Sequence, residues 1–231
     1  MKVELKEHTP NPMELIAFAA RTCYSKDPSQ CKKTPQEYIE MLMNSGHESP
    51  IEHVSYTFFI EGISRACSHQ LVRHRISSVS QRSQRYISES SFEYIIPKSL
   101  AGKSVILPDV INTVKAEDYF IETMEILQER YAVLQTALGG AKESSNEDAR
   151  YVLPNACQTT LVLTMNVRSL CHFFHERLCH RAQWEIRELA GKMLELVKPT
   201  APELWEHAGP KCKLFGYCKE HKSCGLSPRK A

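Results

Sequence analysis

The chain lacks a long run of apolar residues. No stretch of its 231 residues approaches the roughly 20 apolar positions that a membrane-spanning helix needs. The first ten residues alternate in polarity and contain no apolar core of a secretory signal. We therefore expect a cytoplasmic protein with no membrane partner. Its nine cysteines are then best interpreted as thiols or metal ligands rather than disulfides.

The chain also has few glycines, and they form no phosphate-binding loop. None of the nine glycines belongs to a Gly-x-Gly-x-x-Gly pattern after a candidate strand. That pattern marks the Rossmann dinucleotide-binding fold, because its glycines let the backbone approach a pyrophosphate closely. A dinucleotide would therefore have to bind this chain without a Rossmann fold.

Excess charge is small as well. The 29 basic and 27 acidic residues leave a formal net charge of +2, which argues against long-range attraction to nucleic acid. The chain contains no internal repeat, low-complexity segment or long linker. Hydrophobic residues make up 42% of the chain, so a chain of this length can build one substantial core.

Hydrophobic periodicity predicts helices and strands that do not alternate regularly. Residues 34–46 carry the clearest helix signals, with Thr34 as N-cap, Glu37 closing a capping box and Gly46 beyond the end. The other predicted helices are 13–21, 64–75, 120–138, 147–153 and 168–198, and the predicted strands are 53–60, 92–96 and 159–167. We expect an α+β fold, a single domain in which long helices flank an antiparallel sheet. The domain is expected at residues 1–205, followed by a cysteine-rich tail at 206–231.

The segment 73–86 is a dense array of hydrogen-bond donors. It holds four arginines, one histidine and four serines in fourteen positions. The guanidinium fork suits phosphate and carboxylate, and serine hydroxyls can complete an anion cradle. On charge alone, a helix end followed by a solvated loop is the favoured interpretation of the segment. A nucleic-acid-binding module that uses these arginines on phosphates is the alternative from another functional class.

The order of the residues within this segment carries more information. Arg73-His74-Arg75, followed by seven residues and then Ser83, with Arg85-Tyr86 just beyond, resembles the signature of flavin-dependent thymidylate synthases. Three further segments also resemble that family: 46–53, 166–170, and Arg177 with 182–186. The resemblance as a whole extends from about residue 20 to residue 200.

The resemblance implies a role for each matched position. The positions that would contact FAD, in a non-Rossmann flavin site, are His53, Ser55, Arg73, His74, Arg75, Gln81, Asn166, Arg168 and His172. The positions that would hold dUMP are Gln70, Gln81, Arg82, Ser83, Arg85, Arg150 and Arg177. Arg177 matches the arginine that meets the uracil ring and favours ionisation at N3, and is the expected catalytic residue.

The resemblance also implies the reaction and the assembly. The family makes dTMP from dUMP, with 5,10-methylenetetrahydrofolate as one-carbon donor and NADPH as reductant through FAD. It implies a homotetramer with sites built from several subunits, whose partners are small molecules rather than nucleic acid.

The chain departs from the family pattern at several positions. It has Ser80-Gln81 where the family commonly has Asn-Glu, Leu71-Val72 where it has an aromatic pair, and His172 where it often has Asn. Gln81 can form hydrogen bonds but brings no negative charge. An inactive relative that keeps its flavin is therefore a further alternative.

Two groups of cysteine and histidine residues could suggest a metal. His175 and His180 are five apart, so they do not share a helix face as zinc-protease histidines do. Cys212, Cys218 and Cys224 with His221 have the right chemistry for zinc, but their spacing is not that of a zinc knuckle. We expect no metal. The scattered Cys23, Cys31, Cys67, Cys157, Cys171 and Cys179 are expected to serve packing.

One apolar stripe has two interpretations. Phe120, Met124, Leu127, Tyr131, Leu134 and Leu138 recur at spacings of four and three. The stripe could face the core or form an oligomer seam, and the sequence does not distinguish the two.

Overall fold

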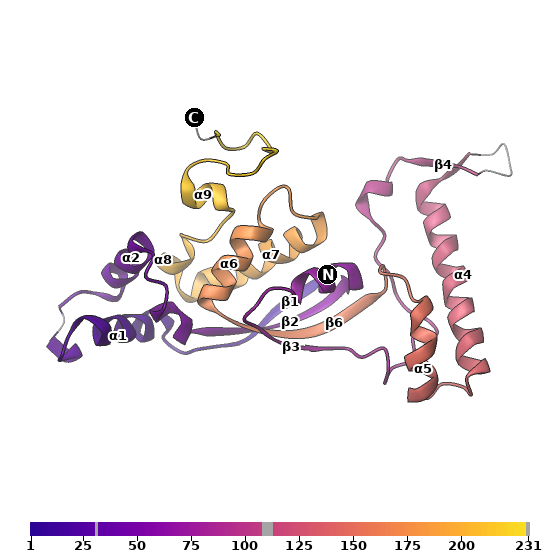
Figure 1. Cartoon of the computed structure of the whole chain (residues 1–231), viewed down its shortest axis with the longest axis horizontal. Helices are drawn as coiled ribbons and strands as arrows, with labels where there is room; N and C mark the ends of the chain where they lie inside the picture. The colour runs from indigo at the N-terminus through magenta and orange to yellow at the C-terminus, as the bar shows by residue number, and fades with distance from the viewer. Residues whose placement is uncertain (31, 108–112, 230–231) are drawn as a thin grey trace. The chain divides into compact units, whose positions relative to one another are not determined.

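The computed structural model describes residues 1–30, 32–107 and 113–229 (Figure 1). These residues form two compact units. The first unit contains Met1–Ile60, Gln70–Ser80 and Leu161–Ala231, and the second contains Glu61–His69 and Gln81–Thr160. Because the ranges interleave along the chain, the two units belong to a single domain. Cys31 lies outside the described residues.

The main sheet has four strands in the order β1-β2-β6-β3. These strands are β1 (Lys2–His8), β2 (Ser55–Ser64), β6 (Gln158–Asn166) and β3 (Ser78–Gln81). β2 and β6 run antiparallel, since Val54 bonds Val167, Thr57 bonds Thr164 and Arg65 bonds Cys157. The strands predicted at 53–60 and 159–167 and the α+β class are thereby confirmed. β1 and β3 were not predicted.

Buried and more exposed residues alternate along the two central strands, so one face of the sheet lies in the core. Tyr56, Phe58 and Ile60 of β2 are fully buried, while their sequence neighbours are more exposed. β6 shows the same two-residue period. Strict alternation of this kind is what a half-buried antiparallel strand requires.

Helices α6 (Val167–Arg177) and α7 (Trp184–Val197) cover the sheet in the first unit. They pack on each other, and α7 also packs on β1 (Figure 1). Trp205 is fully buried and meets the rings of Tyr56 and Phe174 edge-on, at centroid distances of 5.4 and 5.7 Å. Large interlocked rings of this kind dominate the burial energy of a small core.

The single helix predicted at 168–198 is wrong, because it is broken between α6 and α7. The α-helix ends at Arg177, and α7 begins when the side chain of Gln183 accepts hydrogen bonds from the amides of Glu185 and Ile186 at 3.0 and 3.1 Å. Glutamine is not among the favoured N-cap residues, so no helix-start signal precedes α7 in the sequence.

Two further helices of the first unit lie before β2. α1 (Pro12–Tyr24) packs against α2 (Pro35–Ser45). The capping box predicted for α2 is confirmed: Glu37 N donates to Thr34 Oγ1 at 3.3 Å, and Thr34 N donates to Glu37 Oε2 at 2.7 Å. Gly46 ends the helix with φ 70°, a left-handed conformation that glycine adopts without strain.

The second unit is built around α4 (Ala116–Ala137), which packs against α5 (Glu143–Ala149). The core-facing interpretation of the α4 stripe is confirmed at Met124 and Tyr131, which are buried. It is wrong at Leu134 and Leu138, which are 40% and 43% exposed, whereas the polar side chain of Gln135 is buried in the same turn. α3 (Arg65–Leu71) precedes this region, and β4 (Ser104–Ile106) pairs antiparallel with β5 (Thr113–Lys115).

Three more predicted boundaries are corrected. The strand at 92–96 is only an isolated bridge from Tyr94 to Cys157. The helix predicted at 147–153 begins earlier, as α5, and closes with a 3₁₀ turn at Arg150–Val152. The helix predicted at 64–75 ends at Leu71. Short strands and helices of one or two turns contain too few residues for a clear hydrophobic period. The sequence therefore predicts the bounds of such short elements poorly.

The C-terminal region contains two short helices. α8 (Pro202–Trp205) ends just before the cysteine-rich tail, and α9 (Lys211–Phe215) lies within it. The remaining 3₁₀ turns are Pro28–Gln30, Pro50–His53, Lys98–Leu100 and Lys198–Thr200. Within the described part of the chain, no helix is both long and apolar enough to cross a membrane.

The scattered cysteines, which we expected to serve packing in the core or at the surface, occupy both kinds of position. Cys67, Cys157 and Cys171 are buried, whereas Cys23 is exposed. Burial raises the pKa of the Cys157 and Cys171 thiols to about 12, so both stay protonated and act as apolar packing groups.

Candidate functional site

A cavity of about 390 Å³ in the first unit brings together four of the residues expected to contact FAD. These are Arg75, Asn166, Arg168 and His172, which come from the segment after α3 and from the start of α6. Glu48 and Glu52 also line this cavity, and both come from the segment just before β2. Residues as far apart in sequence as Glu48 and His175, 127 positions, therefore line one cavity.

Local hydrogen bonds fix the start of α6 beside Arg75. The side chain of Asn166 caps the helix, because its Oδ1 accepts from Ser169 N at 2.8 Å. Ser169 Oγ in turn accepts from Ile76 N at 3.2 Å, which attaches the 75–76 segment to the first turn. A helix N-terminus carries partial positive charge, so this arrangement with Arg75 favours an anionic ligand.

Arg168 is held by two carboxylates. Its Nε donates to Glu48 Oε2 at 3.1 Å, and its Nη1 donates to Glu52 Oε1 at 2.6 Å. These ion pairs, led by the bond to Glu52, raise the pKa of Arg168 above its usual value. The guanidinium is 53% exposed, so the pairs orient it more than they stabilise the fold.

His74 and Arg177 form the second feature of the site. Arg177 Nε donates to His74 Nε2 at 2.8 Å. The imidazole is 6% exposed and stands edge-on to the Phe173 ring, with centroids 5.0 Å apart. Burial, with the charge of Arg177 second, lowers the pKa of His74 to about 4. His74 is therefore neutral near pH 7.

The tautomer of His74 follows from this bond. A neutral imidazole that accepts at Nε2 carries its proton at Nδ1. Nδ1 is buried and has no hydrogen-bond partner among the described residues. A buried N–H without a partner costs free energy, which a bound ligand with an acceptor would recover.

The remaining first-unit residues of the expected site are outside the cavity lining. His53 closes the turn Pro50–His53 and is exposed, as is Arg73. Ser55 begins β2, where its amide donates to Thr9 Oγ1 at 3.0 Å. Gln70 lies near the end of α3.

The second unit holds the other residues expected to bind dUMP. Gln81 Nε2 donates to Ser68 Oγ at 2.9 Å and to Thr159 Oγ1 at 3.1 Å. Arg82 Nη2 donates to the Gln158 carbonyl at 2.8 Å, and Arg82 Nε lies 3.8 Å from the buried Glu89. Both side chains are therefore anchored by the scaffold of their own unit.

Ser83, Arg85 and Arg150 converge near α5. Arg85 N donates to Ser83 Oγ at 3.2 Å, and the Arg85 guanidinium pairs with Glu143 at 2.8 Å and Glu147 at 2.6 Å. Arg150 Nε donates to the carbonyl of Glu147 at 3.1 Å. The two arginines and the hydroxyl can form an anion cradle, but two carboxylates occupy the fork of Arg85 in this state.

Sequence reasoning missed the carboxylates. Glu48 and Glu52 lie 120 and 116 residues from Arg168, so no local pattern could pair them. One signal was available: Asn166 stands three residues before Ser169, the spacing of an N-cap bond, and this would have placed the start of α6.

Comparison with known proteins gives consistent matches. The family described as thymidylate synthase complementing protein matches residues 4–203. A flavin-dependent thymidylate synthase of Clostridium tetani is 47% identical, over 97% of this chain and 93% of the relative. One from Nitratidesulfovibrio vulgaris is 44% identical, over 98% and 95%, and one from Pyrococcus horikoshii is 40% identical, over 96% and 91%.

The match spans nearly the whole chain, and both parts of the site that we describe fall inside it. Arg73-His74-Arg75, the 166–170 segment and Arg177 all lie within residues 4–203. The resemblance first seen in these motifs is therefore confirmed, and the chain belongs to the flavin-dependent thymidylate synthase family.

Proposed function

We propose that the protein makes dTMP from dUMP, with 5,10-methylenetetrahydrofolate as one-carbon donor and NADPH as reductant through FAD. Membership of the family supports this function. The observation that carries it is the bond between Arg177 and the buried, neutral His74, next to residues that line one cavity.

The residues present fit an FAD cofactor. Arg75, Arg168 and the capped N-terminus of α6 suit its phosphates, and the unpaired Nδ1–H of His74 suits a ring acceptor. Asn166 and His172 complete the cavity wall, while His53, Ser55 and Arg73 flank it in sequence. When bound, the flavin supplies the hydride and one-carbon chemistry that no side chain here can perform.

Arg177 stabilises negative charge on the uracil. Carbon 5 of uracil attacks as a nucleophile only when charge develops over N3 and the carbonyls, and a fixed guanidinium lowers the energy of that charge. Arginine cannot act as an ordinary base at neutral pH, so its role is electrostatic. Because Nε is committed to His74, the terminal nitrogens are the ones presented to the substrate.

Ser83, Arg85 and Arg150 bind the phosphate of dUMP together with Arg82, and Gln70 also takes part in binding dUMP. Their convergence near α5 supports this assignment. Gln81 contacts the nucleotide and the flavin through its amide, whose Nε2 is oriented by Ser68 and Thr159. Among the residues that the structure describes, no base forms a hydrogen bond with Ser83, and a phosphate ligand needs only its hydroxyl.

The enzyme works as a cytoplasmic homotetramer. A second stripe on α4 supports association: Tyr119, Ile126 and Val133 recur at seven-residue spacing and are 43%, 46% and 55% exposed. A row of exposed large apolar side chains along one helix is typical of an interface between subunits.

The nucleic-acid-binding alternative gains little support. Arg85 and Arg168 pair with two carboxylates each, and Arg82 lies near Glu89. Guanidinium groups neutralised in this way attract a polyanion weakly.

The first test is the visible absorption spectrum of the purified protein, before and after anaerobic NADPH with dUMP present. We expect a flavin spectrum that bleaches, followed by dTMP formation when methylenetetrahydrofolate is added. A colourless protein that takes up no added FAD would overturn the proposal.

A further inference from the structure

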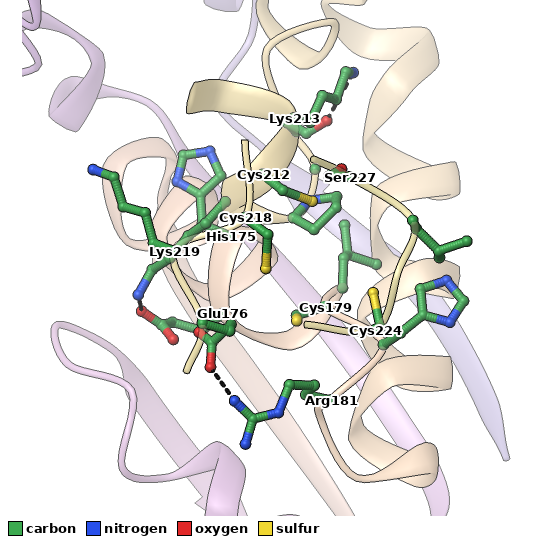
Figure 2. A pocket seen from close by; sticks show the side chains of 18 of the residues that line it. His175, Glu176, Cys179, Arg181, Cys212, Lys213, Cys218, Lys219, Cys224 and Ser227 are labelled. Atoms are coloured by element: carbon green, nitrogen blue, oxygen red, sulfur yellow. Dashed lines mark hydrogen bonds and ion pairs between the residues drawn. The ribbon is translucent and has the colours of Figure 1, made fainter. Parts of the chain in front are cut away.

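A second cavity, of about 590 Å³, lies in the first unit beyond the end of α6 (Figure 2). Four cysteines line it: Cys179, Cys212, Cys218 and Cys224. Figure 2 shows the four side chains around this hollow, with the sulfur atoms of Cys179, Cys218 and Cys224 facing its interior. None of the residues assigned above to FAD or dUMP lines it.

The four thiols reach the cavity from three segments of the chain. Cys179 follows the end of α6, and Cys212 lies in α9. Cys218 and Cys224 lie on one loop, which is closed at its base where Cys218 N donates to the Pro228 carbonyl at 2.7 Å. A second bond, from Arg229 Nη2 to the His221 carbonyl at 2.8 Å, crosses the same loop.

All four thiols are free, which leaves their sulfur atoms available as ligands. Four cysteine sulfurs arranged as a tetrahedron form the usual structural site for Zn²⁺. His221, the fourth ligand that the sequence suggested, is not part of the lining. Cys179 takes its place, and it is 33 positions or more away from the tail cysteines in sequence.

The charge around the cavity suits such a centre. The lining contains four basic side chains, Arg181, Lys211, Lys213 and Lys219, and two acidic ones, Glu176 and Glu220. Its formal excess is therefore two positive charges, with neutral histidines. A Zn²⁺ ion with four thiolates carries two negative charges, so the lining would balance the centre.

The wall is already partly ordered by ion pairs. Arg181 Nη1 bonds Glu220 Oε2 at 2.6 Å, and Lys211 pairs with Glu176. Each pair joins the region around the end of α6 to the tail. These contacts hold the tail cysteines on the same side of α6 as Cys179.

We propose that Cys179, Cys212, Cys218 and Cys224 bind one structural Zn²⁺ ion. Among the described residues, no three ligand side chains are already close enough to share an ion. Zn–S bonds of about 2.3 Å place the sulfurs roughly 3.8 Å apart, so binding draws α9 and the loop inward against α6. This proposal departs from the sequence-based expectation of no metal, because only the fold brings Cys179 to the tail.

The site is independent of the proposed reaction. The family match ends at residue 203, before Cys212, Cys218 and Cys224. Zinc here would attach the tail to the first unit without touching the flavin cavity, which shares only His175 with this lining. Its loss should therefore affect the tail before it affects the chemistry.

The test uses the reduced full-length protein, stripped of metal and titrated with Zn²⁺ or Co²⁺ alone. We expect one ion per chain, with Co²⁺ giving the intense sulfur-to-metal charge-transfer bands of a four-thiolate site. Zn²⁺ should also protect the tail from limited proteolysis. Wild-type protein that takes up no metal, or whose Co²⁺ spectrum lacks thiolate bands, would overturn the proposal.

Variants identify the ligands. Cys179→Ser and Cys218→Ser should each weaken Zn²⁺ binding by more than about 100-fold, since loss of even an outer partner costs 10–100-fold. The matched control is Cys23→Ser, an exposed cysteine outside the cavity, which should bind as wild type does. Circular dichroism identifies any variant that fails to fold. In that case the Zn²⁺ and Co²⁺ titrations of the wild-type protein decide whether the metal site exists.

Two further outcomes would contradict the assignment. If His221→Ala abolished binding while Cys179→Ser left it intact, the ligand set would be the tail alone. If the protein bound no metal but formed a disulfide among these cysteines on mild oxidation, detected by mass spectrometry, the cluster would be a redox pair instead.

Discussion

Arg177 donates from Nε to Nε2 of His74 across 2.8 Å, joining two residues that are 103 positions apart in sequence. The bond requires a neutral imidazole, because a protonated His74 would present an N–H to the guanidinium. The low pKa of His74, about 4, ensures that state at neutral pH. The contact therefore orients the guanidinium of Arg177, for which we propose a catalytic role, and it can be tested by pH and by substitution.

Acid should destabilise the fold through His74. Its pKa falls from 6.5 to about 4 on folding, so between these values the unfolded chain binds more protons. The contribution of His74 to the free energy of unfolding is therefore fully present above pH 6.5 and is lost as the pH falls toward 4. Between pH 7 and 5 we expect a loss of about 2 kcal/mol from this group. Urea unfolding at both pH values measures it, and His74→Asn should reduce the difference.

Removing the guanidinium should abolish dTMP formation while flavin stays bound. We expect Arg177→Ala to lower kcat by on the order of 10²–10³, the usual effect of losing one transition-state charge partner. Flavin absorbance and steady-state rates measure the two effects separately. Near-normal turnover, or loss of flavin, would contradict the assigned role.

His74 should act through Arg177. His74→Gln keeps an acceptor and should keep part of kcat, whereas His74→Phe keeps only the ring and should lower kcat with little change in the KM for dUMP. Equal kcat values in the two variants would mean that the hydrogen bond does not orient the guanidinium.

Arg85 should bind the phosphate of dUMP in competition with its carboxylates. Arg85→Ala should weaken dUMP binding by about 1.5–3 kcal/mol, the range for a bond to a charged group. Glu147→Gln should strengthen it by at most about 1 kcal/mol, because exposed ion pairs contribute little. Isothermal titration compares both with wild type; unchanged dUMP affinity in Arg85→Ala would remove the cradle assignment.

Gln81 should tolerate a carboxylate. In Gln81→Glu the hydroxyls of Ser68 and Thr159 can rotate to donate where they now accept. We expect a folded variant with turnover at least equal to wild type, measured by dTMP formation. Robust wild-type turnover would exclude an inactive relative, and rescue of an inactive wild type by Gln81→Glu would support one.

The exposed stripe on α4 should hold subunits together. Val133 is 55% exposed, so Val133→Glu costs little in the isolated chain but places charge in an interface. Light scattering after size exclusion should show smaller particles than the tetramer that we propose for the wild type. The matched control is Glu129→Gln, on the same helix, and a Val133→Glu tetramer would exclude the stripe.

Local signals predicted much of the fold. The capping box of Thr34 and Glu37, the alternation in β2 and β6, and the period of α4 up to Tyr131 all arise within short windows, and the structure confirms them. The break before Trp184 gave no such signal, since its cap is a glutamine.

The candidate site was predicted less completely. Motif order located Arg75, Asn166, Arg168 and His172 in one place, and the cavity agrees. Their carboxylate partners and the gathering of Cys179 with the tail depend on contacts between distant segments. Ion pairs between residues that are far apart in sequence produce no periodic pattern, so they become visible only in the folded structure.

The interruption between α6 and α7 shortens the reach of the chain. An unbroken helix over residues 168–198 would be a rod of roughly 46 Å, at about 1.5 Å per residue. Much of that rod would extend past the sheet with its apolar side in water. The turn folds it into a helical hairpin instead, so that Ile186 and Leu189 share a dry interior with Phe173. The break, which the sequence pattern did not reveal, thus replaces one long helix by two packed helices that bury their apolar faces against each other.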